Sequence, residues 1–259
     1  MNGNGFDPDK AARRLAAAWK QQSRITSLSP DETPLNLEEA YSIQSRLMAL
    51  LGQGMAGWKG GGTSPRSLRG DAATPPCFGR LLASRVFKRQ AVRPVPADTG
   101  LLIELEVAFQ FRRTVYPSRE PLDLPTMIDG ALAAFEVVRS RFVDHTLVGH
   151  ASFVADNAGF DALVYSDQAL SINDLTRLGE RAEVWCGDTL VRQALSEDER
   201  TDPLTALQFI WQQLAMRDLS IGEGDIVTTG TLVAPIHASG AGQYEGRIGE
   251  AVVQIEFAA

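Results

Sequence analysis

The chain has 259 residues, of which 44% are hydrophobic and 22% are charged, and its formal net charge at pH 7 is −7. This composition is ordinary for a globular protein and supplies enough apolar material for a sizeable core. Nucleic acids and anionic membranes attract basic surfaces, so the negative charge argues against both as partners. Cys77 and Cys186 fit no metal or disulfide spacing, and the first residues lack the pattern of a signal peptide. We therefore expect a cytoplasmic protein that does not span a membrane.

Helices are predicted at the start of the chain. Asp7 followed by Pro8 is typical of a helix start, because the side chain caps the first turn and proline needs no hydrogen-bond partner there. Asn36 with Glu39 three residues later has the spacing of a capping box, and Gly52 is a suitable end for that second helix. The two helices predict an N-terminal helical layer.

Strands dominate the rest of the chain. The predicted elements are, in order, a turn at 60–62, a strand at 101–111, a helix at about 124–134, a strand at 135–141, antiparallel strands between 145 and 195, a helix from 202, and strands at 225–229 and 250–257. We expect an α+β fold in which a helical layer, residues 1–53, precedes a β-rich catalytic domain, residues 54–259.

An acidic strand is the most informative stretch. In a strand, successive side chains point to opposite faces, so Glu104 and Glu106 share one face at a separation of about 6.6 Å along the strand. Two negative charges this close repel each other unless a cation lies between them or water screens them. The pattern fits a metal site, and it also fits a half-buried strand with a solvated acidic face.

A third acid, Glu136, lies within a strongly apolar run. An unpaired charge there would be costly, so it needs a metal ion or a salt bridge, with Arg139 or Arg141 as the nearest partners. Carboxylate ligands suit hard cations such as Mg²⁺ or Mn²⁺. Three of them would leave coordination positions open for water and substrate.

Lys59 lies between Trp58 and the glycines at 60–62. Glycines allow backbone N–H groups to approach an anion closely, although the order of residues is not that of a P-loop. Without further context, this pattern favours a surface turn with a solvated lysine.

No histidine-based or serine-based site can be identified. His145, His150 and His237 do not have the spacing of metal ligands, and we interpret them as loop residues or as internally satisfied. No nucleophile elbow of the Gly-x-Ser-x-Gly type occurs.

Five motifs occur together in a recognisable order. They are Gly57-Trp58-Lys59, Glu104-x-Glu106, Phe135 to Arg141, Ala155 to Ala158, and Thr229-Gly230-Thr231. In order and spacing they resemble the hydratase/decarboxylase branch of the fumarylacetoacetate hydrolase superfamily, which includes 2-keto-4-pentenoate hydratases and 4-oxalocrotonate decarboxylases. The resemblance spans nearly the whole chain. It implies a curved mixed β-sandwich or β-roll with N-terminal helices, assembled as a homo-oligomer.

The resemblance also implies a set of site residues. Glu104, Glu106 and Glu136 match the family's ligands for Mg²⁺ or Mn²⁺, and Lys59 matches a catalytic lysine beside the substrate. The predicted substrate-binding residues are Thr63, Ser64, Asp156, Asn157 and Thr231.

This chain departs from the family pattern at several positions. Cys77 replaces an acid in a Pro-Asp-Phe-Gly loop and is the second predicted catalytic residue, although a thiol is less suited to proton transfer near neutral pH. Gly159 replaces a serine, the glycine run at 60–62 lacks the usual leucine, and a late loop at 241–244 is shortened. The metal site is retained, whereas the groups that transfer protons are altered.

The expected function is therefore a divalent-metal-dependent lyase that adds water to a 2-hydroxy-2,4-dienoate or its 2-oxo-enoate tautomer. One alternative is decarboxylation of a 2-oxo-enedioate, through the same type of enolate. A second is a catalytically altered family member that binds a small 2-oxo acid or acts as the partner of a pathway enzyme.

Overall fold

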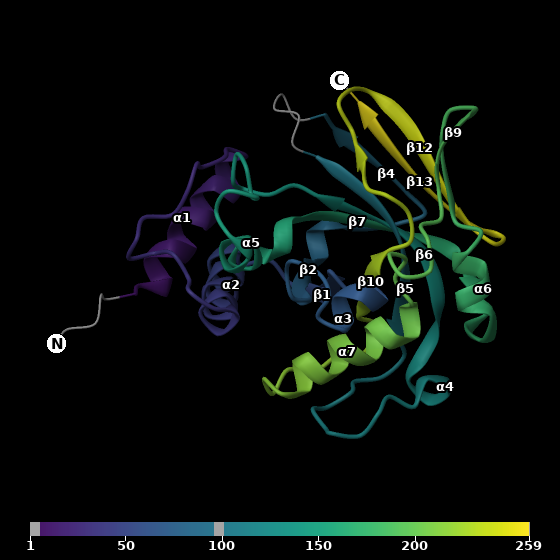
Figure 1. Cartoon of the computed structure of the whole chain (residues 1–259), viewed down its shortest axis with the longest axis horizontal. Helices are drawn as coiled ribbons and strands as arrows, with labels where there is room; N and C mark the ends of the chain where they lie inside the picture. The colour runs from purple at the N-terminus through teal and green to yellow at the C-terminus, as the bar shows by residue number, and fades with distance from the viewer. Residues whose placement is uncertain (1–5, 96–100, 259) are drawn as a thin grey trace.

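The computed structural model describes residues 6–95 and 101–258. Its α-helices are α1 (Pro8–Gln21), α2 (Leu37–Leu51), α3 (Pro65–Leu68), α4 (Leu124–Met127), α5 (His150–Ala155), α6 (Leu175–Gly179) and α7 (Pro203–Ala215). Its strands are β1 (Met55–Gly61), β2 (Cys77–Leu82), β3 (Val86–Lys88), β4 (Gln90–Pro94), β5 (Leu102–Phe111), β6 (Ile128–Val138), β7 (Phe160–Leu170), β8 (Glu183–Cys186), β9 (Thr189–Gln193), β10 (Ile226–Thr231), β11 (Ile236–His237), β12 (Gly242–Ile248) and β13 (Ala251–Ala258). The predicted α+β class is confirmed (Figure 1).

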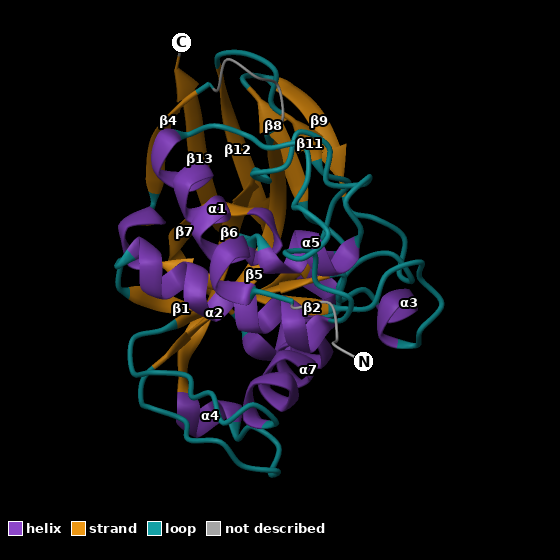
Figure 2. Cartoon of the chain, turned by 90° about the vertical axis from the view of Figure 1, so that its left-hand side faces the viewer, coloured by secondary structure: helices purple, strands orange, loops and turns teal. Residues whose placement is uncertain are grey.

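The strands form two sheets. The larger has the order β2-β1-β10-β5-β6-β7-β3, with β11 added beside β5, and the smaller has the order β4-β13-β12-β8-β9. The strands curl into a half-barrel, with α1 and α2 in front of it in the view of Figure 2. At the centre of the larger sheet, the long antiparallel pair β5–β6 places Glu104 directly opposite Glu136.

The predicted helix caps are confirmed. The Asp7 carboxylate accepts hydrogen bonds from the backbone N–H groups of Asp9 and Lys10, both at 3.0 Å. The Asn36 side chain accepts one from the N–H of Glu39 at 2.9 Å, and Gly52 ends α2 in the left-handed conformation that favours glycine.

Two predicted elements are wrong. Of the helix expected at 124–134, only Leu124–Met127 is helical, and the chain continues as β6. The alanine-rich part of β6 is buried between β5 and β7, so sheet pairing overrides its helix propensity. The glycines at 60–62 do not form a free turn, because Gly60 and Gly61 belong to β1. A Cβ on Gly60 would lie 2.7 Å from the Ile210 side chain, so glycine there lets α7 approach the sheet closely.

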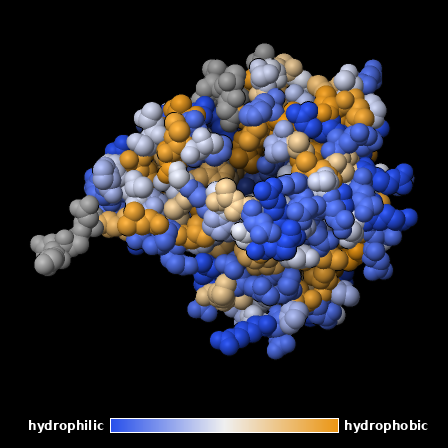
Figure 3. Space-filling view, viewed as in Figure 1, coloured by the Kyte–Doolittle hydropathy of each residue, from blue (hydrophilic) through white to orange (hydrophobic). Residues whose placement is uncertain are grey.

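The helices and the sheets share one hydrophobic core. The buried Gln44 of α2 donates hydrogen bonds to the carbonyls of Phe78, at 3.2 Å, and Val154, at 3.0 Å, and so connects the N-terminal layer to the site region. The proposed domain boundary after residue 53 stays a prediction. No helix in the described ranges is long and apolar enough to cross a membrane. Hydrophilic side chains dominate the face shown in Figure 3, which is hollowed between the N-terminal helices and the strands.

Candidate metal centre and active site

Three glutamates converge on one face of the larger sheet. Glu104 and Glu106 alternate along β5, and Glu136 pairs with Glu104 from β6. Each carboxylate offers an oxygen atom, and these three oxygens all lie within 4.8 Å of one another. The residues proposed as ligands from sequence are thus brought together by strand alternation and antiparallel register.

The glutamate oxygens are not satisfied by the protein. Glu106 and Glu136 are fully buried, so the solvated acidic face that the sequence also allowed is wrong for these two. The N–H of Gly230 donates to Glu106 Oε2 at 2.9 Å, but Glu106 Oε1 and Glu136 Oε2 receive no hydrogen bond from the residues described. Buried carboxylate oxygens without donors are costly, and a hard divalent cation with oxygen ligands is the group that fits them.

The electrostatics agree with this interpretation. Burial raises the pKa of Glu136 to about 7, even though Lys59 acts in the opposite direction. Burial and then the two neighbouring carboxylates raise the pKa of Glu106 well above its ordinary value. The three groups therefore resist being charged together unless additional positive charge is present.

Lys59 is part of this site and is not a solvated surface residue. It lies on β1, is 3% exposed, and its Nζ is 2.7 Å from Glu136 Oε1. Glu136 therefore pairs with Lys59, and not with Arg139 or Arg141 as the sequence suggested. Burial acts to lower the pKa of Lys59, but the nearby glutamates outweigh it and raise the pKa above its usual value. The side chain stays an ammonium group, one cation against three acids.

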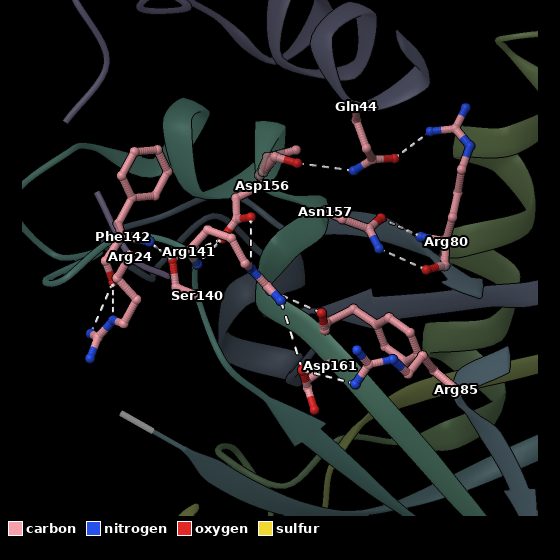
Figure 4. A network of polar contacts seen from close by, with 12 residues as sticks. Arg24, Gln44, Arg80, Arg85, Ser140, Arg141, Phe142, Asp156, Asn157 and Asp161 are labelled. Carbon is pink, nitrogen blue, oxygen red and sulfur yellow. Dashed lines mark hydrogen bonds and ion pairs between the residues drawn. The ribbon is translucent and has the colours of Figure 1, made fainter. Parts of the chain in front are cut away.

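A left-handed turn supplies the second contact of Lys59. Asn157 and Ala158 have φ values of 55° and 49°, and the Ala158 carbonyl accepts a hydrogen bond from Lys59 Nζ at 3.2 Å. The Asn157 side chain holds this turn by accepting from the N–H of Arg80 at 2.7 Å and donating to its carbonyl at 2.8 Å (Figure 4). Asn157 thus positions a partner of the lysine.

The neighbouring Asp156 belongs to a different network. Its carboxylate is fully buried and accepts hydrogen bonds from the Ser140 hydroxyl, at 2.9 Å, and from the backbone N–H of Arg141, at 2.6 Å. The Arg141 guanidinium lies 3.1 Å away and also approaches Asp161 at 3.9 Å (Figure 4). This acid is therefore paired entirely within the protein.

The remaining predicted substrate-binding residues have backbone partners. The Thr63 hydroxyl donates to the Thr229 carbonyl, and that of Thr231 donates to the Val233 carbonyl at 2.7 Å. Ser64 caps α3.

A cavity of about 400 Å³ opens beside the glutamates. It is lined by Lys59, Gly61, Gly62, Thr74, Pro75, Cys77, Leu102, Glu104, Val138, His145, Thr146, Gly149, His150 and Phe153. None of the five predicted substrate-binding residues is in this lining. His145 and His150 are in it, although their spacing in the sequence gave no sign of a site. A larger cavity, of about 630 Å³, is rich in arginine and shares no residue with the glutamate site.

Cys77 lines the cavity but is poorly suited to take up a proton. Its side chain is buried, and burial raises its pKa to about 11, although Lys59 acts to lower it. The group is therefore a neutral thiol at pH 7.

Known proteins similar to this chain were found by sequence and by structure. No family model matches the chain. A 2-keto-4-pentenoate hydratase of Paraburkholderia phymatum is 28% identical over 250 residues, covering 93% of each chain. A 2-oxo-hept-4-ene-1,7-dioate hydratase of Escherichia coli is 24% identical over 88% of each. The structure of 4-oxalocrotonate decarboxylase from Pseudomonas putida G7, complexed with magnesium and adipate, superposes with a TM-score of 0.81 at 21% identity over 97% of each chain.

The fold and the arrangement of the site resemble those of the fumarylacetoacetate hydrolase superfamily. The full-length similarity to hydratases narrows this resemblance to the hydratase/decarboxylase branch of that superfamily. The resemblance predicted from the five motifs is confirmed.

Proposed function

We propose that this protein is a divalent-metal-dependent hydratase that adds water to a 2-hydroxy-2,4-dienoate or its 2-oxo-enoate tautomer. The observation that carries the proposal is the group of three glutamates beside a cavity lined by Lys59, two of which are fully buried and have oxygens without a hydrogen-bond donor among the described residues. Curated relatives that match the chain over most of its length are hydratases of such acids, which supports the same reaction.

The metal ligands would be Glu104, Glu106 and Glu136. A divalent cation such as Mg²⁺ or Mn²⁺ held there would supply Lewis-acid charge for an anionic substrate. This charge also compensates for the negative charge of the protein near an anionic substrate. Only Glu104 of the three lines the cavity, so substrate enters from its side of the triad.

Lys59 would act as a cation and proton donor. Its ammonium group is held by Glu136 and by the Ala158 carbonyl, and its raised pKa keeps it protonated. From this position it can pair with the substrate and stabilise the enolate formed during ketonisation.

Several finer features remain part of the proposal. They are substrate contacts by Thr63, Ser64, Asp156, Asn157 and Thr231, a sandwich or roll description of the sheets, a homo-oligomer, an associated pathway enzyme, and a cytoplasmic location. The catalytic role predicted for Cys77 stays untested, and its neutral thiol does not favour it. The hydrogen bonds of Asp156 and Asn157 favour a positioning role over direct contact with the substrate.

Spectroscopy tests the function directly. The purified protein is incubated with Mn²⁺ and 2-hydroxypenta-2,4-dienoate, and loss of the conjugated chromophore is followed while the product is identified by mass. We expect a product that is heavier than the substrate by one water. Absence of turnover, with metal and pyruvate still bound, would instead support the altered binding protein. Release of CO₂ from a 2-oxo-enedioate, with no hydration of either substrate, would favour the decarboxylase.

A further inference from the structure

One imidazole in the cavity has a nitrogen without a partner. His150 is the first residue of α5 and lines the same cavity as Lys59 and Glu104. Its Nε2 is shielded from solvent and makes no hydrogen bond within the described part of the chain. Buried polar atoms are nearly always hydrogen-bonded, so an exception in the wall of a substrate cavity points to a partner that arrives with the substrate.

The backbone holds this side chain in place. Gly149, with φ at 81°, adopts a conformation that favours glycine and turns the chain into α5. On the same short helix, the Val154 carbonyl accepts the hydrogen bond from Gln44 of α2. Phe153 and Val138 add apolar surface to the same wall, which keeps the imidazole in a poorly hydrated environment.

The protonation states in the cavity leave few groups able to accept a proton. Lys59 is an ammonium group, Cys77 is a neutral thiol, and Glu104 is one of the proposed metal ligands. Burial lowers the pKa of His150, with a hydrogen bond to the Pro75 carbonyl acting in the opposite direction. His150 is therefore a neutral imidazole at pH 7, and a neutral imidazole carries one nitrogen lone pair.

We propose that His150 is the catalytic acid/base group for the water-addition step, in the role for which Cys77 is unsuited. This inference rests on the proposed hydratase function. As the oxygen of water bonds to C4 of the 2-oxo-3-enoate, one water proton moves to the imidazole. The C3–C4 π electrons shift to form the enolate of the 2-oxo group. The imidazolium then returns the proton to C3, which gives the 4-hydroxy-2-oxo acid and restores the neutral imidazole.

The proposal separates two steps of one reaction. Ketonisation of the dienol requires the enolate-stabilising groups, whereas hydration additionally requires His150. Replacing His150→Gln keeps a polar side chain of similar reach but removes the titratable nitrogen. We expect hydration to fall by about 100-fold or more, and ketonisation and Mn²⁺ affinity to change by less than about threefold. The matched control is His237→Gln, at an exposed histidine of β11 outside the cavity, which we expect to leave both rates unchanged.

The ratio of the two rates in a single sample is the decisive measurement, because a partly unfolded preparation lowers both equally. Ketonisation is followed by loss of the dienol chromophore, and hydration by the amount of hydroxy acid formed. For His150→Ala, added imidazole should restore part of the hydration rate. A hydration-to-ketonisation ratio equal to that of the wild type would overturn the role of His150. A wild-type protein that turns over no dienoate would instead overturn the proposed function itself.

Discussion

Two buried charged clusters lie close together in this protein, and they differ in how their charges are balanced. Around Asp156 and Asp161, three arginines face two acids, and each carboxylate has cationic or hydrogen-bonding partners. Around Lys59, one cation faces three glutamates, and two buried carboxylate oxygens have no donor among the residues that the structure describes. The first cluster is complete without a ligand, whereas the second needs one. Unbalanced charge, and not burial alone, distinguishes the candidate active site from a structural ion-pair network.

The largest effect on stability is expected in the cluster around Asp156 and Asp161, whose charges are balanced within the protein. Arg141→Met leaves the fully buried Asp156 carboxylate without its guanidinium, so the free energy of unfolding should fall by about 3–5 kcal/mol. Urea denaturation measures this change. Arg69→Met, which removes an exposed partner of Asp198, is the control and should cost less than about 1 kcal/mol. Equal losses in the two variants would contradict the structural role of the Arg141 network.

In the cluster around Lys59 and the three glutamates, the unbalanced cluster, a rise in pH should lower the stability of the protein. An ordinary salt bridge has the opposite effect, because its carboxylate stabilises the fold once it is ionised. The pKa of Glu136 rises from 4.5 to about 7 on folding, so the metal-free folded state holds more protons than the unfolded state between these pH values. The free energy of unfolding should therefore fall as pH rises through that window, by roughly 3 kcal/mol from this group. Urea denaturation in EDTA at pH 5 and pH 8 tests this. Saturating Mn²⁺ should reduce this pH dependence of the free energy of unfolding, and so should Glu136→Gln in EDTA. An unchanged pH dependence under both conditions would refute titration of Glu136 as its cause.

Lys59→Met tests whether the unbalanced cluster takes part in catalysis. The substitution removes the one cation of the unbalanced cluster and keeps most of the side-chain stem. Turnover of the dienoate should fall by about 100-fold or more, while Mn²⁺ affinity stays the same or increases because a repelling charge is lost. Steady-state kinetics and a metal titration give the two numbers. Lys88→Met, at an exposed lysine that pairs with Asp167, serves as the control. Near-normal turnover in Lys59→Met would remove this residue from the mechanism.

The smallest effect is expected at Cys77. Because the buried thiol is neutral at pH 7, Cys77→Ala should change the hydration rate by less than about threefold. A loss comparable to that of His150→Gln would instead return the proton-transfer role to Cys77.

The sequence predicted the parts of the site that depend on local periodicity. Alternation along β5 placed Glu104 and Glu106 on one face, the apolar run around Glu136 indicated a third acid in need of a partner, and the family resemblance gave Lys59 its role. Taken alone, Lys59 was interpreted as a solvated residue, because its burial depends on β2 and β10 pairing on either side of β1. Such long-range pairing leaves no local signal.

Other features could not be predicted for related reasons. The alanine-rich start of β6 has a composition that favours a helix, and only its two neighbouring strands make it a strand. His150 belongs to no motif, and its relevance depends on a cavity formed by segments distant in sequence. The family motif at residues 155–158 implied a substrate contact by Asp156, whereas the structure pairs its side chain with Arg141.

The most direct test of the central claim is a titration of the metal-free protein with Mn²⁺, followed by electron paramagnetic resonance of the free ion. Wild type should bind one Mn²⁺ per chain, and Glu106→Gln should bind it more than about tenfold more weakly, since a charged ligand is lost. Glu256→Gln, at an exposed position on β13, should match wild type. Equal Mn²⁺ affinity in wild type, Glu104→Gln and Glu106→Gln would contradict a metal centre formed by these glutamates.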